Sequence, residues 1–254
     1  MSTKTKIALV TGGSRGLGRN SAIKIAQKGL DVIITYRSNK EEADKVVEEI
    51  QRLGQKAIAY QLDTKDIKNF DAFVKQVGDH LEENTGSRNI DYLINNAGTS
   101  LHASISDVTE EQLDDVVDIH FKGIFFLTQK FLPFINNGGG IVNISSGLAR
   151  FATPGYAVYG GIKAGIEMLT KYMAKELGSR QIKANVVAPG AIETDFGGGA
   201  VRDLKEVNNT IASVTALGRA GVPDDIGGVV AFLCTEDARW INGQRIEVSG
   251  GMFL

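Results

Sequence analysis

The sequence has very little cysteine, no excess of charge of one sign and no long hydrophobic run. Cys234 is the single cysteine among 254 residues, so the chain forms no internal disulfide and no cysteine-based metal cluster. The 28 basic and 30 acidic side chains give a formal charge of −2, which argues against a surface that binds nucleic acid. No stretch of about 18 apolar residues occurs, so no membrane span is expected.

Targeting and metal signals are also missing. Residues 1–6 are polar and contain no hydrophobic signal segment. The three histidines have no metal-ligand spacing, so no metal site is expected. Cys234 lies in an apolar run, which is typical of a buried thiol. These features predict a protein of a reducing compartment, the cytoplasm.

Glycine, by contrast, is abundant. It accounts for 30 of 254 residues, about 12%, against roughly 7% in ordinary proteins. This excess predicts tight turns, or places where the backbone approaches a ligand closely.

Short apolar runs alternate with helical patterns along the whole chain. The predicted strands are Ile7–Val10, Val32–Tyr36, Ala57–Gln61, Tyr92–Asn95, Ile141–Ser145, Lys183–Ala188 and Arg245–Val248. The predicted helices are Gly18–Lys28, Lys40–Leu53, Ile67–Glu82, Glu111–Phe134, Tyr159–Leu177 and Asp224–Leu233. Continuous apolar strands are typical of parallel strands covered on both faces. The pattern predicts one α/β domain over residues 1–254, a Rossmann fold whose doubly wound parallel β-sheet has helices on both faces. Any ligand should bind at the carboxyl edge of the strands.

One segment breaks this alternation. Residues 190–222 contain three successive glycines, at 197–199, followed by a polar, poorly periodic stretch. A long insertion at the carboxyl edge of a strand predicts a mobile lid or substrate loop.

A glycine-rich turn follows the first predicted strand and opens the first predicted helix. It reads Thr11, Gly12, Gly13, Ser14, Arg15, Gly16, Leu17 and Gly18. Glycines let the backbone turn sharply, and a helix N-terminus attracts a pyrophosphate, so the turn predicts a dinucleotide site. The alternative is a turn that binds no ligand.

This spacing, with four further motifs, resembles the short-chain dehydrogenase/reductase family, which binds NAD(H) or NADP(H). The other motifs are Asn95-Asn96-Ala97-Gly98 after the fourth strand, Ser146, the pair Tyr159 and Lys163, and Pro189-Gly190 followed by Ile192 and Thr194. The resemblance covers nearly the whole chain. It implies that the Asn-Asn-Ala-Gly motif and the segment from Pro189 contact the cofactor, and that Ser146, Tyr159 and Lys163 are catalytic.

The end of the second strand bears on the choice of cofactor. It reads Tyr36, Arg37 and Ser38, with no acidic residue before Glu41 to bind ribose hydroxyls. Arg37, with Arg15 from the glycine turn, could meet a 2′-phosphate, so NADP(H) is favoured over NAD(H). Asp63, followed by Thr64, resembles the family's adenine-edge acceptor, although its side chain could instead cap the next helix.

Tyr159 and Lys163 are four residues apart, and therefore on one face of a helix. A tyrosine has an ordinary pKa near 10, and a neighbouring cation is expected to lower that pKa, so the phenol can transfer a proton. Ser146 could polarise a substrate carbonyl. Ser145 is its neighbouring competitor, and the spacing to Tyr159 favours Ser146.

His120 departs from the family pattern. It stands where the family has an asparagine that helps to hold a water beside the lysine. The histidine could keep that role and add a titrating group, or it could only fill the space.

The resulting hypothesis is an NADP(H)-dependent oxidoreductase that interconverts a carbonyl and an alcohol, similar to 3-oxoacyl-acyl-carrier-protein reductases or glucose-dehydrogenase-like members. Phe151 and Phe196 indicate a partly apolar pocket for a small-molecule substrate. A non-catalytic dinucleotide sensor or scaffold is the alternative, and an epimerase or dehydratase is disfavoured by the short C-terminal part. The resemblance also implies a homotetramer, built on the apolar C-terminal tail and on the predicted helices Glu111–Phe134 and Tyr159–Leu177.

Overall fold

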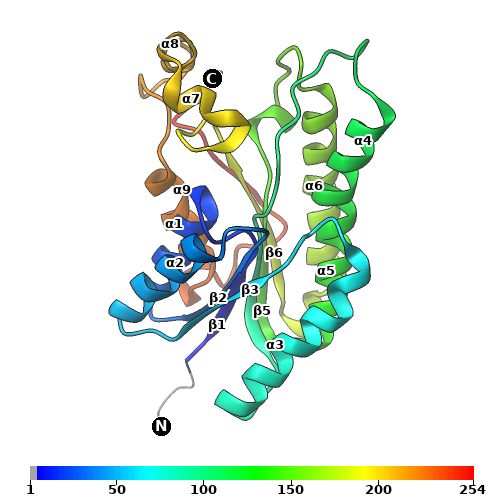
Figure 1. Cartoon of the computed structure of the whole chain (residues 1–254), viewed down its shortest axis with the longest axis vertical. Coiled ribbons are helices and arrows are strands. Elements are labelled where there is room, and N and C mark those ends of the chain that lie inside the picture. The colour runs from blue at the N-terminus through cyan, green and yellow to red at the C-terminus, as the bar shows by residue number, and fades with distance from the viewer. Residues whose placement is uncertain (1–4) are drawn as a thin grey trace.

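A seven-stranded parallel sheet forms the centre of the computed structural model, which describes residues 5–254 (Figure 1). The strand order is β3-β2-β1-β4-β5-β6-β7. The strands are β1 Ile7–Val10, β2 Asp31–Tyr36, β3 Ala57–Gln61, β4 Ile90–Asn95, β5 Ile135–Ile144, β6 Lys183–Pro189 and β7 Arg245–Val248. The chain order reverses between β1 and β4, and this reversal places a crevice at the carboxyl ends of the strands. The predicted doubly wound Rossmann fold is confirmed.

Helices cover both faces of the sheet. They are α1 Gly16–Gln27, α2 Lys40–Arg52, α3 Phe70–Thr85, α4 Glu110–Val117, α5 Gly123–Phe131, α6 Ala157–Glu176, α7 Ala200–Asp203, α8 Lys205–Ser213 and α9 Pro223–Leu233. Buried residues of α1, α2 and α9 form one apolar core with the sheet, and those of α3, α5 and α6 form a second core on the other face. The two groups of helices lie on opposite sides of the sheet in Figure 1. Burial on both faces explains why the strands are continuous apolar runs.

Two predicted elements differ in their course. The predicted helix Glu111–Phe134 is divided into α4 and α5 by the π-helical turn Asp118–Lys122. Strand β5 begins six residues earlier than predicted, at Ile135, because glycines at 138–140 bring the backbone close to β4. A Cβ at Gly139 would lie 2.2 Å from the carbonyl oxygen of Asp91.

The segment 190–222 is more ordered than the predicted loop, because it contains the short helices α7 and α8. Gly197, Gly198 and Gly199 all have positive φ, and they turn the chain from the sheet edge into α7. Together the two helices cover the carboxyl edge of the sheet at one end of the molecule (Figure 1). Within residues 5–254, no helix has the length and apolar character that crossing a membrane requires.

Candidate active site

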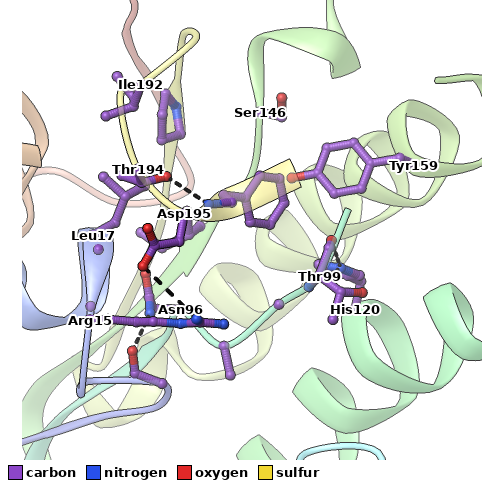
Figure 2. Close-up of a pocket in the computed structure, with 18 of the residues that line it drawn as sticks. Arg15, Leu17, Asn96, Thr99, His120, Ser146, Tyr159, Ile192, Thr194 and Asp195 are labelled. Carbon is purple, nitrogen blue, oxygen red and sulfur yellow. Dashed lines mark hydrogen bonds and ion pairs between the residues drawn. The ribbon is translucent and has the colours of Figure 1, made fainter. Parts of the chain in front are cut away.

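A cavity of about 620 Å³ lies at the carboxyl edge of the sheet, and most of the predicted site residues line it (Figure 2). These residues are Gly12, Ser14, Arg15, Gly16, Leu17, Gly18, Arg37, Ser38, Asp63, Thr64, Asn96, Ala97, Gly98, His120, Ser146, Tyr159, Lys163, Pro189, Gly190, Ile192 and Thr194. They come from segments that are far apart in the sequence, and parallel strands bring such segments to one edge.

The glycine-rich turn is held against the strand that carries the Asn-Asn-Ala-Gly motif. The Asn96 side-chain nitrogen donates to the carbonyl oxygens of Thr11 and Gly12, at 2.9 and 3.2 Å. A Cβ at Gly18 would lie only 2.1 Å from the carbonyl oxygen of Gly12, so a side chain there would push the turn and α1 apart. Gly18 thus lets α1 begin directly beside the turn, and the start of this helix lines the cavity, where its backbone N–H groups can bind an anion.

Three predicted cofactor residues, Thr11, Tyr36 and Asn95, do not line the cavity; all three are buried. The Thr11 hydroxyl oxygen accepts hydrogen bonds from the backbone nitrogens of Asn96 and Ala97, at 2.9 and 3.0 Å. The amide of Asn95 donates to Asn143 Oδ1 at 2.8 Å, inside the core. The side chains of Thr11 and Asn95 therefore support the turn and the strand ends, and direct contact of these three residues with the cofactor stays a prediction.

Arg37 and Ser38 lie at one end of the cavity, after β2. The second predicted arginine, Arg15, has its guanidinium 4.0 Å from the carboxylate of Asp195, and both side chains are largely exposed. Asp63 lines the cavity, and its Oδ1 accepts a hydrogen bond from the backbone nitrogen of Lys65 at 2.9 Å. It does not cap the next helical turn, Ile67–Asn69, because the N-cap there is Asp66, and its contact with adenine stays a prediction.

Ser146, at the end of β5, and Tyr159, in the first turn of α6, face each other across the cavity (Figure 2). The Ser146 hydroxyl has the smallest effect on the pKa of Tyr159, which it lowers. Burial has the larger effect and raises the pKa of Tyr159, and the neighbouring Tyr156 raises it further. The phenol therefore keeps its proton at neutral pH.

Lys163 is buried one helical turn after Tyr159, and its ammonium nitrogen lies 5.6 Å from the centroid of the tyrosine ring. Its Nζ donates to the carbonyl oxygen of Ile144 at 2.7 Å. Burial lowers the pKa of Lys163 to about 7. The expectation that this cation lowers the pKa of Tyr159 is therefore wrong for the protein alone, because removal from water outweighs the charge at both residues.

The two neighbouring serines have different surroundings. Ser145 is buried and donates to Glu167 Oε1 at 2.8 Å, on α6. Ser146 faces Tyr159, and its oxygen accepts a hydrogen bond from the backbone nitrogen of Leu148 at 3.2 Å. The Ser145 hydroxyl is thus engaged with α6, whereas the Ser146 hydroxyl faces the phenol.

His120 is buried in the π-helical turn between α4 and α5. Its Nε2 lies 3.1 Å from the backbone nitrogen and 2.7 Å from the carbonyl oxygen of Thr99, and its ring stands perpendicular to that of Tyr159, with centroids 5.4 Å apart. Its Nδ1 has no hydrogen-bond partner within the described residues. Burial, and secondly the charge of Lys163, hold the pKa of His120 well below its ordinary value, so the ring is neutral.

The half of the cavity beyond Tyr159 is mainly apolar. Phe151 and Phe196 line it, as their aromatic character suggested. The sequence analysis missed its other members, chiefly Tyr156, Val207, Ile211 and Met252. Val207 and Ile211 are four residues apart on α8, and this helical spacing was a usable signal. Met252 had none, because its position depends on how the C-terminal tail folds back. In residues 5–254, no cluster of three or more His, Cys, Asp or Glu side chains could hold a metal ion.

Comparisons with known proteins agree with this geometry. The family described as enoyl-(acyl carrier protein) reductase matches residues 12–253. The 3-oxoacyl-(acyl-carrier-protein) reductase FabG of Staphylococcus aureus is 40% identical over 252 residues, which cover 98% of this chain and 99% of that protein.

Two solved structures extend the comparison. The angucycline C-6 ketoreductase LanV with bound NADP is 37% identical, with a TM-score of 0.92 over 98% of this chain and 95% of that one. The promiscuous reductase LugOII, which catalyses keto-reduction at C1 during lugdunomycin biosynthesis, is 39% identical, with a TM-score of 0.91 over 97% and 96% of the two chains. These relatives support the expected enzyme and its NADP(H) preference, and none supports a non-catalytic sensor. The chain belongs to the short-chain dehydrogenase/reductase family, as an NADP(H)-dependent oxidoreductase that interconverts a carbonyl and an alcohol.

Proposed function

We propose that this enzyme reduces a ketone to a secondary alcohol, with Tyr159 as the proton donor. The observation that carries the proposal is the buried Tyr159 phenol, which faces Ser146 in the cavity and is protonated at neutral pH because burial raises its pKa. A protonated phenol can give its proton to the oxygen of a carbonyl as negative charge develops there. The Ser146 hydroxyl donates a hydrogen bond to the same oxygen and stabilises that charge.

NADPH fits the cavity, and it would supply the hydride that the carbonyl carbon receives. The missing side chain at Gly18 lets α1 pack directly on Gly12 and Asn96, and the turn and the start of α1 line the cavity, so a pyrophosphate could reach the backbone N–H groups there. Arg37, with a planar guanidinium at the end of β2, would bind the 2′-phosphate, and Arg15 would assist it. Ile192 and Thr194 would adjoin the nicotinamide.

Lys163 and His120 have supporting roles in this proposal. Lys163 holds a proton close to the phenol, and the carbonyl of Ile144 keeps the ammonium directed along β5. His120 contacts the Thr99 backbone and the Tyr159 ring as a neutral group. It occupies the position of the family's asparagine and adds no titrating group there.

A homotetramer in the cytoplasm completes the proposal. Met168 and Tyr172 on α6 and Phe125 on α5 are large apolar side chains at the surface, on the helices through which the family associates. Trp240 and Leu254 are almost fully exposed near the C-terminus. The sole thiol, Cys234, is buried, and its pKa is raised to about 12, so the protein needs no oxidising compartment.

The experiment is NADPH oxidation, followed by absorbance, with ketones, quinones and 3-oxoacyl thioesters as substrates. The thioesters are presented both on an acyl carrier protein and on N-acetylcysteamine. Turnover of a ketone that Tyr159→Phe abolishes is expected. Absence of turnover with every carbonyl contradicts the proposal, and a strong preference for the carrier-bound thioester would make the carrier the physiological substrate holder.

A further inference from the structure

The segment that follows β7 contributes to the wall of the cavity, in a part that the motifs of the sequence analysis do not form. Met252 is buried and lines the apolar half of the cavity, although it is only two residues from the C-terminus. The residue after Met252 is Phe253, and its ring packs on that of Phe151 with centroids 4.6 Å apart. The tail therefore contributes a wall to the cavity and does not extend freely into solvent.

The backbone of the tail is forced into an uncommon course. Gly250 and Gly251 have φ of 63° and 78°, which glycine adopts readily, but Phe253 has a φ of 54°, which is uncommon for a bulky residue. Such a conformation persists only where neighbouring contacts impose it, and it tends to mark a functional segment.

The first set of contacts comes from the segment that follows α8. The backbone nitrogens of Ala216 and Leu217 donate to the carbonyl oxygens of Gly251 and Gly250, at 3.2 and 3.0 Å. In the opposite direction, the nitrogen of Phe253 donates to the carbonyl oxygen of Val214 at 2.9 Å. The tail is thus paired with the base of the helix that closes the cavity.

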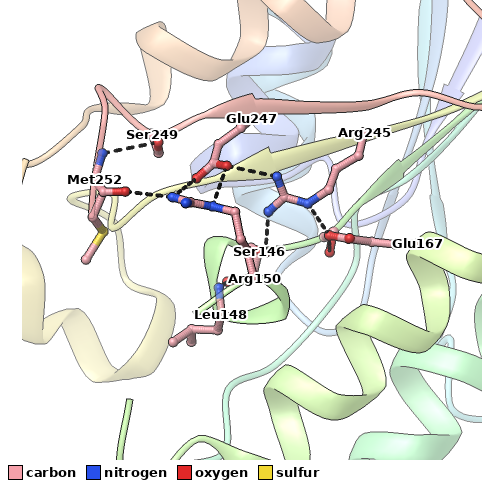
Figure 3. Close-up of polar contacts among 9 residues, drawn as sticks. Ser146, Leu148, Arg150, Glu167, Arg245, Glu247, Ser249 and Met252 are labelled. Carbon is pink, nitrogen blue, oxygen red and sulfur yellow. Dashed lines mark hydrogen bonds and ion pairs between the residues drawn. The ribbon is translucent and has the colours of Figure 1, made fainter. Parts of the chain in front are cut away.

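The second set comes from Arg150, four residues after Ser146 (Figure 3). Its Nη2 donates to the carbonyl oxygen of Met252 at 2.8 Å, and its Nε pairs with Glu247 Oε2 at 2.8 Å. Arg245 continues the chain of ion pairs from Glu247 to Glu167, the residue that holds Ser145. One connected set of charges therefore joins the serine loop to the tail.

We propose that Met252 is a specificity-determining residue, positioned by Arg150, and that it selects neutral, ring-bearing ketones. This inference rests on the proposed ketone reduction. Met252 lines the same cavity as the rings of Phe151 and Phe196, its thioether is an adaptable apolar surface, and sulfur–aromatic contact favours a flat ring against it. Arg150 is bonded to Glu247 and to the carbonyl oxygen of Met252. Arg202 pairs with Asp195 and Asp203. Neither guanidinium is free to recognise a charged substituent or an acidic carrier.

The test compares a small and a larger cyclic ketone, cyclohexanone and 2-tetralone. Their dissociation constants from the enzyme–NADP⁺ complex are measured by calorimetry, and their kcat/KM values are measured with NADPH. In Met252→Ala, cyclohexanone loses contacts, whereas the second ring of 2-tetralone enters the new space. The preference for 2-tetralone should rise by about 10-fold or more, the range that one removed methylene produces in an apolar pocket.

Further variants separate specificity from folding. Met252→Leu conserves volume and should keep the wild-type preference. Arg150→Ala should move the preference in the same direction as Met252→Ala while leaving NADPH affinity unchanged, because the arginine positions the wall without lining the nucleotide half. Leu254→Ala, in an exposed residue of the same tail, is the matched control and should leave the preference between the two ketones unchanged.

An unchanged preference in both Met252→Ala and Arg150→Ala overturns the assignment. Since the binding constants do not require turnover, a wild-type enzyme that binds these ketones selectively but reduces none of them contradicts the proposed function and leaves this inference standing.

Discussion

The ammonium nitrogen of Lys163 lies 2.7 Å from the carbonyl oxygen of Ile144, the last residue of β5, and this contact ties α6 to the strand that Ser146 follows. Lys163 and Tyr159 are on the same face of α6, so the contact also fixes the rotation of the helix relative to the sheet. The side chains of Ser146 and Tyr159 thereby face each other before any substrate arrives, and in the proposed reaction this would lower the cost of organising the transition state.

Replacing Tyr159 by phenylalanine should lower kcat by at least about 10²–10⁴-fold, the usual contribution of a positioned acid or base. The ring remains against His120, so the fold and NADPH binding should be retained. Steady-state rates and fluorescence titration with NADPH check this. Tyr172→Phe, on the exposed face of the same helix, is the control, and near-normal turnover by Tyr159→Phe would remove the proposed proton donor.

Activity should fall as the pH rises above about 7. Burial lowers the pKa of Lys163 to about 7, so the charge beside the phenol is lost above that pH in the free enzyme. The pH dependence of kcat/KM reports this ionisation. Lys171→Met, on the same helix but exposed, should leave the profile unchanged, and a profile that is flat from pH 6 to 9 in the wild type contradicts the expectation.

The lowered pKa of Lys163 also makes the stability of the fold depend on pH. Between pH 7 and its ordinary pKa of 10.5, Lys163 holds a proton in the unfolded chain but not in the folded one, so stability rises with pH across that window. Lys163→Met should remove this contribution and raise the unfolding temperature at pH 7. Thermal unfolding of both proteins from pH 7 to 10 tests it.

His120→Asn should leave the pH profile between 6 and 8 unchanged, because the pKa of His120 lies well below its ordinary value and the ring is neutral throughout. His120→Ala, in contrast, leaves the backbone of Thr99 without its partner, at a cost of about 1–3 kcal/mol. Below pH 6.5 the histidine gains a proton in the unfolded wild-type chain but not in the folded one. As the pH is lowered, the stability of the wild type should therefore decrease more steeply than that of His120→Asn. A pH inflection present only in the wild type between 6 and 8 would show that His120 titrates during turnover.

Arg37→Asp should shift the ratio of kcat/KM for NADPH and NADH toward NADH by at least about 10-fold. A carboxylate repels a 2′-phosphate and can accept hydrogen bonds from ribose hydroxyls. Arg52→Asp, at the exposed end of α2, introduces the same charge change away from the cavity and serves as the control. If both variants keep the wild-type ratio, Arg37 does not read the phosphate.

Light scattering should give a mass four times the 27.3 kDa of one chain. Tyr172→Glu places a charge in the exposed apolar surface of α6 and should produce smaller species, whereas Lys171→Glu should not. A monomeric wild type contradicts the tetramer.

Much of the fold and of the cofactor half of the site could be predicted, because the relevant signals are local. Continuous apolar strands indicate a parallel sheet, and the glycine-rich turn lies directly between β1 and α1. The motif does not distinguish Asn95, which bonds inside the core, from Asn96, which holds the glycine-rich turn, because side chains alternate along a strand. The pKa of Tyr159 could not be inferred either, since burial depends on packing that the spacing to Lys163 does not reveal. Met252 is the clearest case, because its contact with Arg150 joins residues 102 positions apart.

The folded-back tail also affects the order in which the enzyme is completed during synthesis. The glycine-rich turn, Arg37 and the Asn-Asn-Ala-Gly motif all lie within the first 98 residues, whereas Met252 follows every strand of the sheet. The apolar half of the cavity therefore stays open to solvent until the segment after β7 has been made and has folded back. A chain that ends prematurely near residue 248 would retain every strand and much of the nucleotide site, and would be an enzyme with a cofactor but an unbounded substrate compartment.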